Sequence, residues 1–376
     1  MADYIIFLAI STSIFALFAL GLNLQWGFTG LVNFGHVAFM ILGAYTTVLL
    51  SLKGVPLLLS VLIGAGVAAL LGLVIGFSTL RLREDYLSIV TIGTGELIRL
   101  IVNNQDLPVG NNWTPGAFGV QTYPIPLSDA PNLFLKFGMI ALLTLLAGLS
   151  FWQLWRWIRF AQRFTGVDSA SKVGNPREFA SRLIVGILLG VLSVAVYISG
   201  VMGLNDSNPK ASLMLLSLLI LAFVFWRLEI LVRSPWGRVL KAIREDEEVP
   251  RALGKNVFWY KLQSIMLGGA IAGVAGAFYA WQISAIYPNN FEPQQTFDAW
   301  IMVILGGSGN NLGTILGTVI YFIYYEGTRN LDQILPLDEA RLGAFRIMLI
   351  GLILMVLMIW RPQGILGKKE ELTLGK

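Results

Sequence analysis

The sequence of 376 residues contains no cysteine and only one histidine, His36. The absence of cysteine excludes disulfides, Cys-ligated zinc, iron–sulfur clusters and thiol catalysis. A histidine-based metal site or a His-dependent catalytic triad would have to rest on His36, with no second imidazole to support it. A lone histidine of this kind is more often a buried, hydrogen-bonded residue than a ligand. We therefore predict no metal site.

Charged residues are also scarce, at 13% of the chain, against roughly 25% in a typical soluble domain. Hydrophobic residues make up 56%, and only closed helices satisfy the backbone of long apolar segments inside a bilayer. We therefore predict an all-α, polytopic transmembrane helical bundle of about ten helices, with broken or re-entrant segments. The apolar segments fall at about residues 4–24, 36–52, 55–80, 86–103, 133–154, 183–204, 211–231, 262–282, 295–327 and 344–360.

The sequence also lacks the motifs of an ATPase or another enzyme. No G-x-x-x-x-G-K-[ST] motif occurs, because Gly254-Lys255-Asn256 has neither the hydroxyl nor the upstream glycine. Paired carboxylates and nucleophile arrangements typical of enzymes are missing as well. We predict that the chain is not an enzyme, binds no cofactor itself and cannot hydrolyse ATP alone.

The distribution of basic residues predicts how the chain is oriented in a membrane. The formal net charge is +5, but the basic residues lie beside apolar spans, where they set topology and contact membrane lipid, so we predict no nucleic-acid partner. The loop 104–132 contains no lysine or arginine and is interpreted as exterior. The basic stretches 156–182 and 233–262, and the tail 368–376, are interpreted as cytoplasmic. One transmembrane domain is then expected over residues 1–367.

Small and polar residues interrupt two apolar segments, at residues 27–36 and 306–313. Non-helical backbone at membrane depth is tolerated only inside protein or beside a water-filled cavity. The second break is expected at the cytoplasmic end of a helical hairpin. Glycines recur elsewhere at helical spacing, and Gly269 and Gly273 share a face that permits tight packing on a neighbouring helix.

Glu96 and Arg99 are ionisable residues within a predicted span. They lie three positions apart, on one helix face. Intramembrane charges are costly and usually pair or face the protein interior. Two interpretations stay open: a structural salt bridge near the interface, and a lining of a substrate path.

The segment 234–254 predicts a short amphipathic helix between two spans. Ser234 is expected to cap its amino end with Pro235 in the first turn. Its apolar face should comprise Val239, Ala242 and Ile243, and Pro250 should end or bend it. Either an interfacial helix or a docking element for a cytosolic protein fits this pattern, and the acidic run 245–248 favours the protein partner.

Five sequence blocks stand out along the chain: Gly21-Leu22-Asn23-Leu24-Gln25-Trp26-Gly27 through His36 and on to Gly43-Ala44-Tyr45, Leu80 through Arg99, Ser234 through Leu262, Leu305-Gly306-Gly307, and Arg361-Pro362-Gln363-Gly364-Ile365-Leu366-Gly367. In this order they resemble the LivM-type inner-membrane permeases of ABC importers for branched-chain and other neutral amino acids. Residues 158–206 look longer and more divergent than in typical members and resemble the variety found in the cyanobacterial neutral amino acid system.

The resemblance implies a multi-pass permease subunit in the cell inner (plasma) membrane, with a cytoplasmic carboxyl end. It implies four kinds of partner: a second, LivH-type permease subunit, two cytosolic ABC ATPase subunits that bind ATP and Mg²⁺, an external substrate-binding protein, and a small-molecule amino acid. A urea or short-amide importer and, less favoured, an ion-coupled secondary transporter are the alternatives. The resemblance assigns the ATPase-coupling role to Gly237, Arg244, Glu245, Ala252, Leu253 and Gly254.

Four polar residues surround the first break: Asn23, Gln25, Asn33 and His36. A zwitterionic amino acid would need amide donors and acceptors together with freed backbone groups. The same side chains would equally satisfy the interrupted helix. The predicted substrate pathway comprises these four residues with Glu96 and Arg99.

Overall fold

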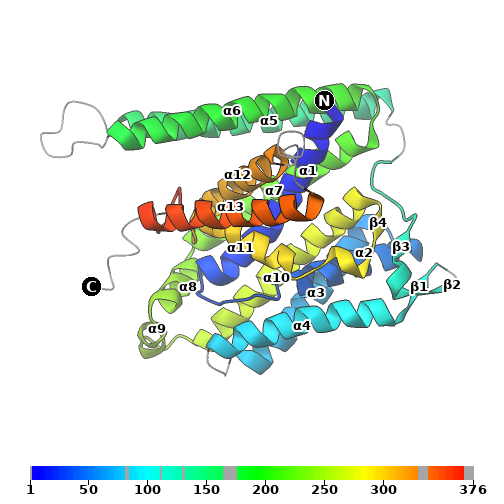
Figure 1. Cartoon of the computed structure of the whole chain (residues 1–376), viewed down its shortest axis with the longest axis horizontal. Coiled ribbons are helices and arrows are strands. Elements are labelled where there is room, and N and C mark those ends of the chain that lie inside the picture. Colours follow the sequence, from blue (N-terminus) through cyan, green and yellow to red (C-terminus); the bar gives the residue numbers. More distant parts are fainter. Residues whose placement is uncertain are drawn as a thin grey trace, which may run out of the picture. The chain divides into compact units, whose positions relative to one another are not determined.

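The computed structural model describes residues 2–80, 84–110, 112–128, 132–163, 176–328 and 338–367. The chain divides into two compact units, one of residues Met1–Ile10 and Leu127–Leu219, the other of Ser11–Pro126 and Ile220–Lys376. The α-helices are α1 (Ala2–Leu22), α2 (Val37–Leu52), α3 (Leu57–Thr79), α4 (Glu84–Asn104), α5 (Leu133–Arg163), α6 (Pro176–Asn205), α7 (Pro209–Arg233), α8 (Pro235–Glu245), α9 (Glu248–Ala252), α10 (Val257–Ile283), α11 (Gln294–Gly306), α12 (Asn311–Gly327) and α13 (Glu339–Trp360) (Figure 1).

Seven helices in these ranges are long and apolar enough to cross a membrane. A further pair, α11 and α12, passes the same test together but is bent by 117° at the break between them. The predicted polytopic helical class is therefore confirmed, including a broken segment. The candidate spans are Ala2–Gly27, Leu57–Thr79, Tyr86–Asn104, Leu133–Arg156, Pro209–Arg233, Val257–Ile283 and Arg341–Trp360.

Helices α2, α3 and α10 pack closely in the larger unit because glycines remove the side chains between them. A Cβ atom on Gly273 would lie 2.8 Å from Cβ of Ala68 in α3, and one on Gly269 would lie 2.8 Å from the Phe39 ring in α2. On Gly276 it would lie 2.0 Å from the carbonyl oxygen of Met40. The predicted packing role of the glycine stripe is confirmed.

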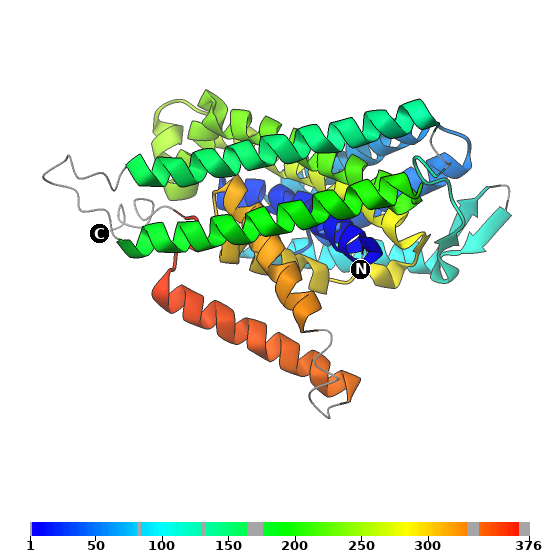
Figure 2. The same ribbon diagram turned by 90° about the horizontal axis from the view of Figure 1, so that it is seen from above.

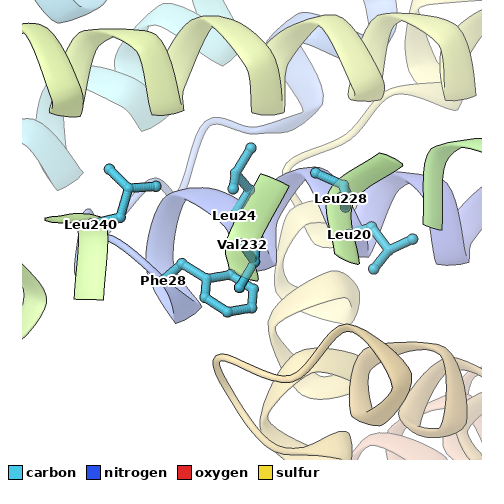
Figure 3. Packing of buried hydrophobic residues seen from close by; sticks show 6 residues of the cluster. All are labelled: Leu20, Leu24, Phe28, Leu228, Val232 and Leu240. Carbon is cyan, nitrogen blue, oxygen red and sulfur yellow. The ribbon is translucent and has the colours of Figure 1, made fainter. Parts of the chain in front are cut away.

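A second apolar cluster joins α1 to α7 and α8 (Figure 3). The cluster contains Leu20 of α1, Leu24 and Phe28 directly after α1, Leu228 and Val232 of α7, and Leu240 of α8. Leu240 is completely buried. The short helix α8 is therefore packed against the membrane-spanning part of this unit.

Helices α5 and α6 lie along each other in the smaller unit (Figures 1 and 2). The hydroxyl of Thr144 lies 3.2 Å from that of Tyr197 across this pair. The predicted insert 156–182 is helical at both ends, since α5 continues to Arg163 and α6 begins at Pro176. Residues 164–175, and the predicted tail 368–376, lie outside the described residues.

The predicted exterior loop 104–132 carries short strands that composition did not predict. β1 (Asp106–Val109) pairs antiparallel with β2 (Asn112–Pro115), and β3 (Val120–Gln121) pairs with β4 (Ala285–Ile286). Strands of two to four residues are too short to show a period-two hydrophobic pattern in the sequence.

Candidate functional site: a junction between two helix breaks

The first break begins where α1 passes into a π-helix, η1 (Asn23–Gly27). The amide of Phe28 donates to the carbonyl of Asn23 at 3.1 Å, which is the wider π pattern. The chain then runs without helix until α2 begins at Val37. A Cβ atom on Gly27 would lie 2.5 Å from the amide nitrogen of Gly309, so only glycine fits at this position.

The side-chain amides of Gln25 and Asn33 hold the first break together. Asn33 Nδ2 donates to Gln25 Oε1 at 2.8 Å, and Gln25 Nε2 donates to the carbonyl of Ile265 at 3.2 Å. Asn33 Oδ1 accepts from the amide of Gly35 at 2.9 Å. Both side chains are buried. The bond to Gly35 satisfies a backbone amide of the break, one of the two roles predicted for the amides; contact with a substrate stays a prediction.

His36 lies directly before α2 and is completely buried. Its Nε2 atom is 3.1 Å from the carbonyl oxygen of Phe18, and its ring centroid lies 4.7 Å from the Phe18 ring. Its Nδ1 has no hydrogen-bond partner among the described residues. Within the ranges given above, no three potential metal ligands gather at His36 or elsewhere.

The second break lies between α11 and α12 and is held by a segment after α13. Asn310 caps α12, accepting from the amide of Gly313 at 3.1 Å, and its Nδ2 donates to the carbonyl of Leu366 at 2.8 Å. The amides of Ile365 and Leu366 donate to the carbonyls of Leu305 and Gly306 at 3.1 and 3.0 Å. The segment after α13 therefore provides the hydrogen-bond donors that the end of α11 would otherwise lack.

The two breaks meet through Asn23. Its Oδ1 accepts from the amide of Gly309 at 3.0 Å, and its Nδ2 donates to Asn311 Oδ1 at 3.3 Å. Asn311 Nδ2 in turn donates to Glu229 Oε2 of α7 at 3.3 Å. The sequence indicated both breaks but not that they touch, because these pairs are far apart in the chain.

Arg244, near the carboxyl end of α8, reaches both breaks. Its Nη1 donates to the carbonyl of Gly27 at 2.5 Å, and its Nη2 donates to Ser308 Oγ at 3.4 Å. The polar contacts between the two breaks and this helix form the break junction, which comprises Asn23, Gly27, Arg244, Ser308, Gly309 and Asn311. Among the predicted site residues, the structure brings Asn23 and Arg244 together.

The start of α8 differs from the prediction in one respect. Pro235 occupies the first turn as expected, but Ser234 makes no capping bond to the helix. Its Oγ donates instead to the carbonyl of Leu231 at 2.6 Å, and its amide still donates to Ile230. Ser234 thus completes the last turn of α7, which leads almost directly into α8.

The buried face of α8 is rotated from the predicted one. Gly237, Leu240 and Ile243 are buried, whereas the predicted Val239 and Ala242 are only half-buried. A Cβ atom on Gly237 would lie 2.2 Å from the carbonyl oxygen of Val232, so this contact sets the rotation of the helix. Ile243 was predicted correctly, but the predicted apolar face was wrong in including Val239 and Ala242 and in omitting Leu240.

Pro250 does not end α8. The helix stops at Glu245, Asp246 is extended with φ −159°, and Pro250 lies buried in the separate short helix α9. Two contacts fix this segment to α10: Trp236 Nε1 donates to Gln263 Oε1 at 2.7 Å, and Lys261 forms an ion pair with Glu247. Sequence reasoning missed the contacts of Gln263 and of the buried Lys261, because it placed Lys261 at the end of the cytoplasmic stretch 233–262 rather than in the helix that packs against α8 and α9.

The six residues assigned to ATPase coupling fall into three groups. Gly237 contacts α7 and the guanidinium of Arg244 contacts the two breaks, as described above. Gly254 ends α9 with φ +73°, a backbone conformation that favours glycine. The remaining three are exposed on the α8–α9 surface, with Leu253 at 75%: Glu245, Ala252 and Leu253.

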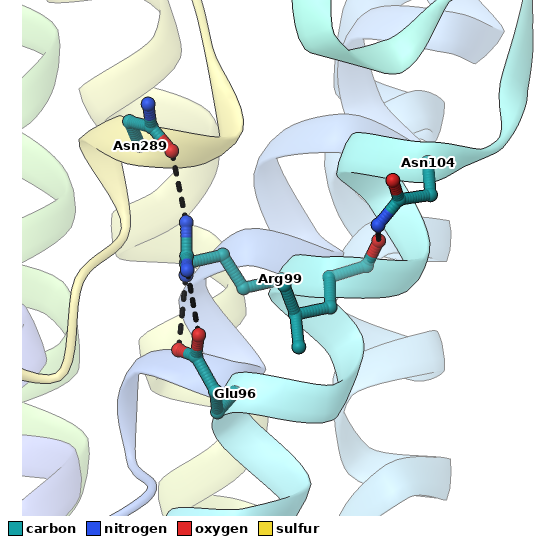
Figure 4. Close-up of polar contacts among 5 residues, drawn as sticks. Glu96, Arg99, Asn104 and Asn289 are labelled. Atoms are coloured by element: carbon teal, nitrogen blue, oxygen red, sulfur yellow. Dashed lines mark hydrogen bonds and ion pairs between the residues drawn. The ribbon is translucent and has the colours of Figure 1, made fainter.

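Glu96 and Arg99 form an ion pair in α4, apart from the break junction (Figure 4). Arg99 Nε and Nη2 donate to the two Glu96 carboxylate oxygens at 2.9 and 2.6 Å, and Nη1 donates to Asn289 Oδ1 at 2.8 Å. Asn289 lies just beyond the carboxyl end of α10, whereas Gln263 and Lys261 lie in its first turns. About 30 Å of helix, at 1.5 Å per residue, therefore separates the pair from α8.

Comparison with known proteins assigns the chain to a family. Residues 4–358 match the family described as branched-chain amino acid transport system / permease component. This chain belongs to that family. The predicted resemblance to LivM-type permeases is thereby confirmed, and the chain is a multi-pass membrane permease of an ABC importer family.

Individual relatives of this permease agree with the family assignment. The high-affinity branched-chain amino acid permease LivM of Salmonella typhimurium is 30% identical over 364 residues, which cover 96% of this chain and 69% of the relative. A probable LivM of Methanocaldococcus jannaschii is 31% identical over 41% of this chain and 46% of its own. A nucleoside ABC transporter permease of Lactococcus lactis is 26% identical over 28% of this chain and 32% of its own. No solved structure matches the chain.

The break junction and the hydrogen bonds directly beside it bring together four of the five sequence blocks by which the permease resembles its family. Gly27 belongs to the first block, Arg244 to the block around α8, and Gly306 to the block that ends α11. The last block supplies Leu366, which bonds to Gly306 and Asn310. The blocks are therefore parts of one contact region in the folded permease.

Proposed function

We propose that the chain is the permease subunit through which branched-chain or other neutral amino acids cross the cell inner (plasma) membrane. Family membership and the LivM relatives over 96% of the chain support this substrate class. A second, LivH-type permease completes the channel, and an external binding protein delivers the amino acid. Two cytosolic ABC ATPases bind ATP and Mg²⁺ and supply the energy, so the permease itself carries out no enzymatic step.

The observation that carries this proposal is the surface of α8 and α9. Leu253 is 75% exposed and Val249 is 53% exposed, and the charged residues Glu248 and Arg251 lie in the same short helix, α9, which ends directly before Leu253 in the chain. Exposed apolar anchors inside a charged rim are typical of protein interfaces. The attachments of this segment to α7 and α10 keep the surface in place, so it is suited to receive a rigid partner such as an ATPase.

The docking surface is tested with Leu253→Asp in a complex purified from native membranes. Because Leu253 is exposed, the permease should fold normally, while retention of the ATPase falls about tenfold or more, as expected for an interface anchor. Lys255→Ser, two positions away and also exposed, is the matched control and should retain the ATPase. Full retention by Leu253→Asp, or purification of the wild-type permease without any ATPase, would contradict the proposal.

The substrate class is tested by uptake of labelled leucine into vesicles that contain the whole complex. Alanine, proline, urea and a nucleoside are added as competitors, and the neutral amino acids are expected to compete. Competition by urea alone would favour the short-amide alternative, and competition by the nucleoside alone would favour the activity named for the Lactococcus relative. Uptake that survives ATP depletion but collapses with the ion gradient would indicate a secondary transporter.

A further inference from the structure

Arg244 connects one helix to two chain segments that are remote in sequence. Its guanidinium donates to Gly27, 217 positions away, and to Ser308, 64 positions away. A guanidinium is planar and presents its donors in a fixed fork, so it holds two acceptors at a set separation. A lysine ammonium has no such fork and cannot fix the same geometry.

The two breaks approach the Arg244 side chain closely, most of all at Gly309. A Cβ atom on Gly309 would lie 2.8 Å from Arg244 Nη1 and 2.8 Å from the carbonyl oxygen of Gly27. One on Gly30 would lie 3.5 Å from Cα of Arg244. A shift of α8 therefore lengthens and weakens these hydrogen bonds, unless the Arg244 side chain or the breaks move with the helix.

The other attachments of α8 do not join the two breaks. Gly237 packs against Val232 of α7, and Trp236 bonds to Gln263 of α10. Lys241 lies over the Phe28 ring, 5.7 Å from its centroid, and so contacts the first break alone. Among these contacts, Arg244 is the one through which α8 holds both breaks.

We propose that Arg244 is a positioning residue that transmits displacement of α8 to the two helix breaks together. Together with the Asn23 contacts, the guanidinium bridge from Gly27 to Ser308 holds the breaks against each other. When a docked ATPase moves α8, the bridge opens and both breaks lose this shared contact, so ATPase movement acts on the α1–η1 and α11–α12 segments in one step. This inference rests on the proposed function, because it needs a partner that moves α8.

The first test needs only the permease, in lipid nanodiscs, and measures hydrogen exchange by mass spectrometry. Arg244→Gln should speed exchange in peptides covering residues 27–36 and 306–313 together, because both breaks lose their common donor. Arg238→Ala, an exposed arginine on the same helix, is the control and should leave both peptides unchanged. Faster exchange in one peptide alone, or in neither, overturns the proposal.

The second test measures uptake per ATP hydrolysed in vesicles holding the complete complex. Arg244→Gln should retain the ATPase and hydrolyse ATP, while uptake per ATP falls about tenfold, the loss expected for a charge-assisted hydrogen bond. Arg244→Lys should recover part of this loss, and Arg238→Ala should match the wild type. Uptake per ATP within twofold of the wild type, or loss of the ATPase itself, overturns the proposal.

Two further readings keep the outcomes distinct. If Arg244→Gln fails to fold, the variant Ser308→Ala tests the proposal instead. It removes one acceptor of the Arg244 bridge without changing the sequence of α8, and it should lower uptake per ATP several-fold. An unchanged ratio in Ser308→Ala would then overturn the proposal. A wild-type complex without ATP-driven uptake contradicts the proposed function instead, while the exchange experiment still decides whether Arg244 holds both breaks.

Discussion

Asn23 shows how a polar side chain is accommodated in an apolar span. Its amide bonds to the amide of Gly309 and to the side chain of Asn311, so one residue uses its donor and its acceptor on the opposite break. An unsatisfied amide would be costly at this depth. The same holds for Gln25 and Asn33, whose partners lie within their own break and in α10.

Glu96 offers a test at the scale of one residue. We expect Glu96→Gln to lower uptake about fivefold while changing assembly with the ATPase by less than twofold. The reason is that a partly exposed ion pair stabilises a protein by only about 0–1 kcal/mol, so losing it should spare assembly. Uptake and ATPase co-purification are measured on the same membranes.

Asn104→Ala is the matched control, because Asn104 lies on the same helix and bonds only to the carbonyl of Leu100 in Figure 4. It should leave uptake and assembly unchanged. An equal loss of both properties in Glu96→Gln would show that the Glu96–Arg99 pair is structural.

At the scale of elements, the helices were predictable from sequence because an apolar run long enough to span a bilayer is a strong compositional signal. The predicted segment 211–231 corresponds to α7, Pro209–Arg233. The rotation of α8 was not predictable, since it depends on the contact of Gly237 with Val232. The bonds from Arg244 to Gly27 and Ser308 were hidden for a similar reason: they depend on tertiary packing between distant segments.

Helix α10 allows a direct test of close packing. We expect Gly276→Ala to lower the free energy of unfolding by about 1–3 kcal/mol, because the new Cβ would lie 2.0 Å from the carbonyl oxygen of Met40. Thermal unfolding of the detergent-solubilised permease measures the change.

Gly66→Ala in α3 is the comparison, since a Cβ at Gly66 meets nothing within 4 Å. Alanine is the better helix former by about 1 kcal/mol, so this variant should be as stable as the wild type or slightly more so. Equal destabilisation by the two changes would show that backbone approach at Gly276 is not the cause.

At the scale of the whole molecule, the absence of cysteine provides a background for mapping orientation. The predicted exterior loop contains Trp113 in β2, 72% exposed, and the predicted cytoplasmic surface contains Glu248 in α9. We expect a membrane-impermeant thiol reagent to label Trp113→Cys in intact cells and Glu248→Cys only after the membrane is opened. The reverse pattern would show that the orientation inferred from basic residues is inverted.

The hydrogen bonds from the amides of Ile365 and Leu366 to the end of α11 also constrain how the protein is made. Synthesis proceeds from the amino end, and early segments fold while later ones are still being added. The ribosome synthesises both breaks well before it reaches residue 365. The carbonyls of Leu305 and Gly306 therefore lack their hydrogen-bond donors, the amides of Ile365 and Leu366, until α12 and α13 have been synthesised. These bonds to the end of α11 therefore form late in biogenesis. A nascent chain stalled before residue 365 should enter the membrane with the α11–α12 hairpin lacking them.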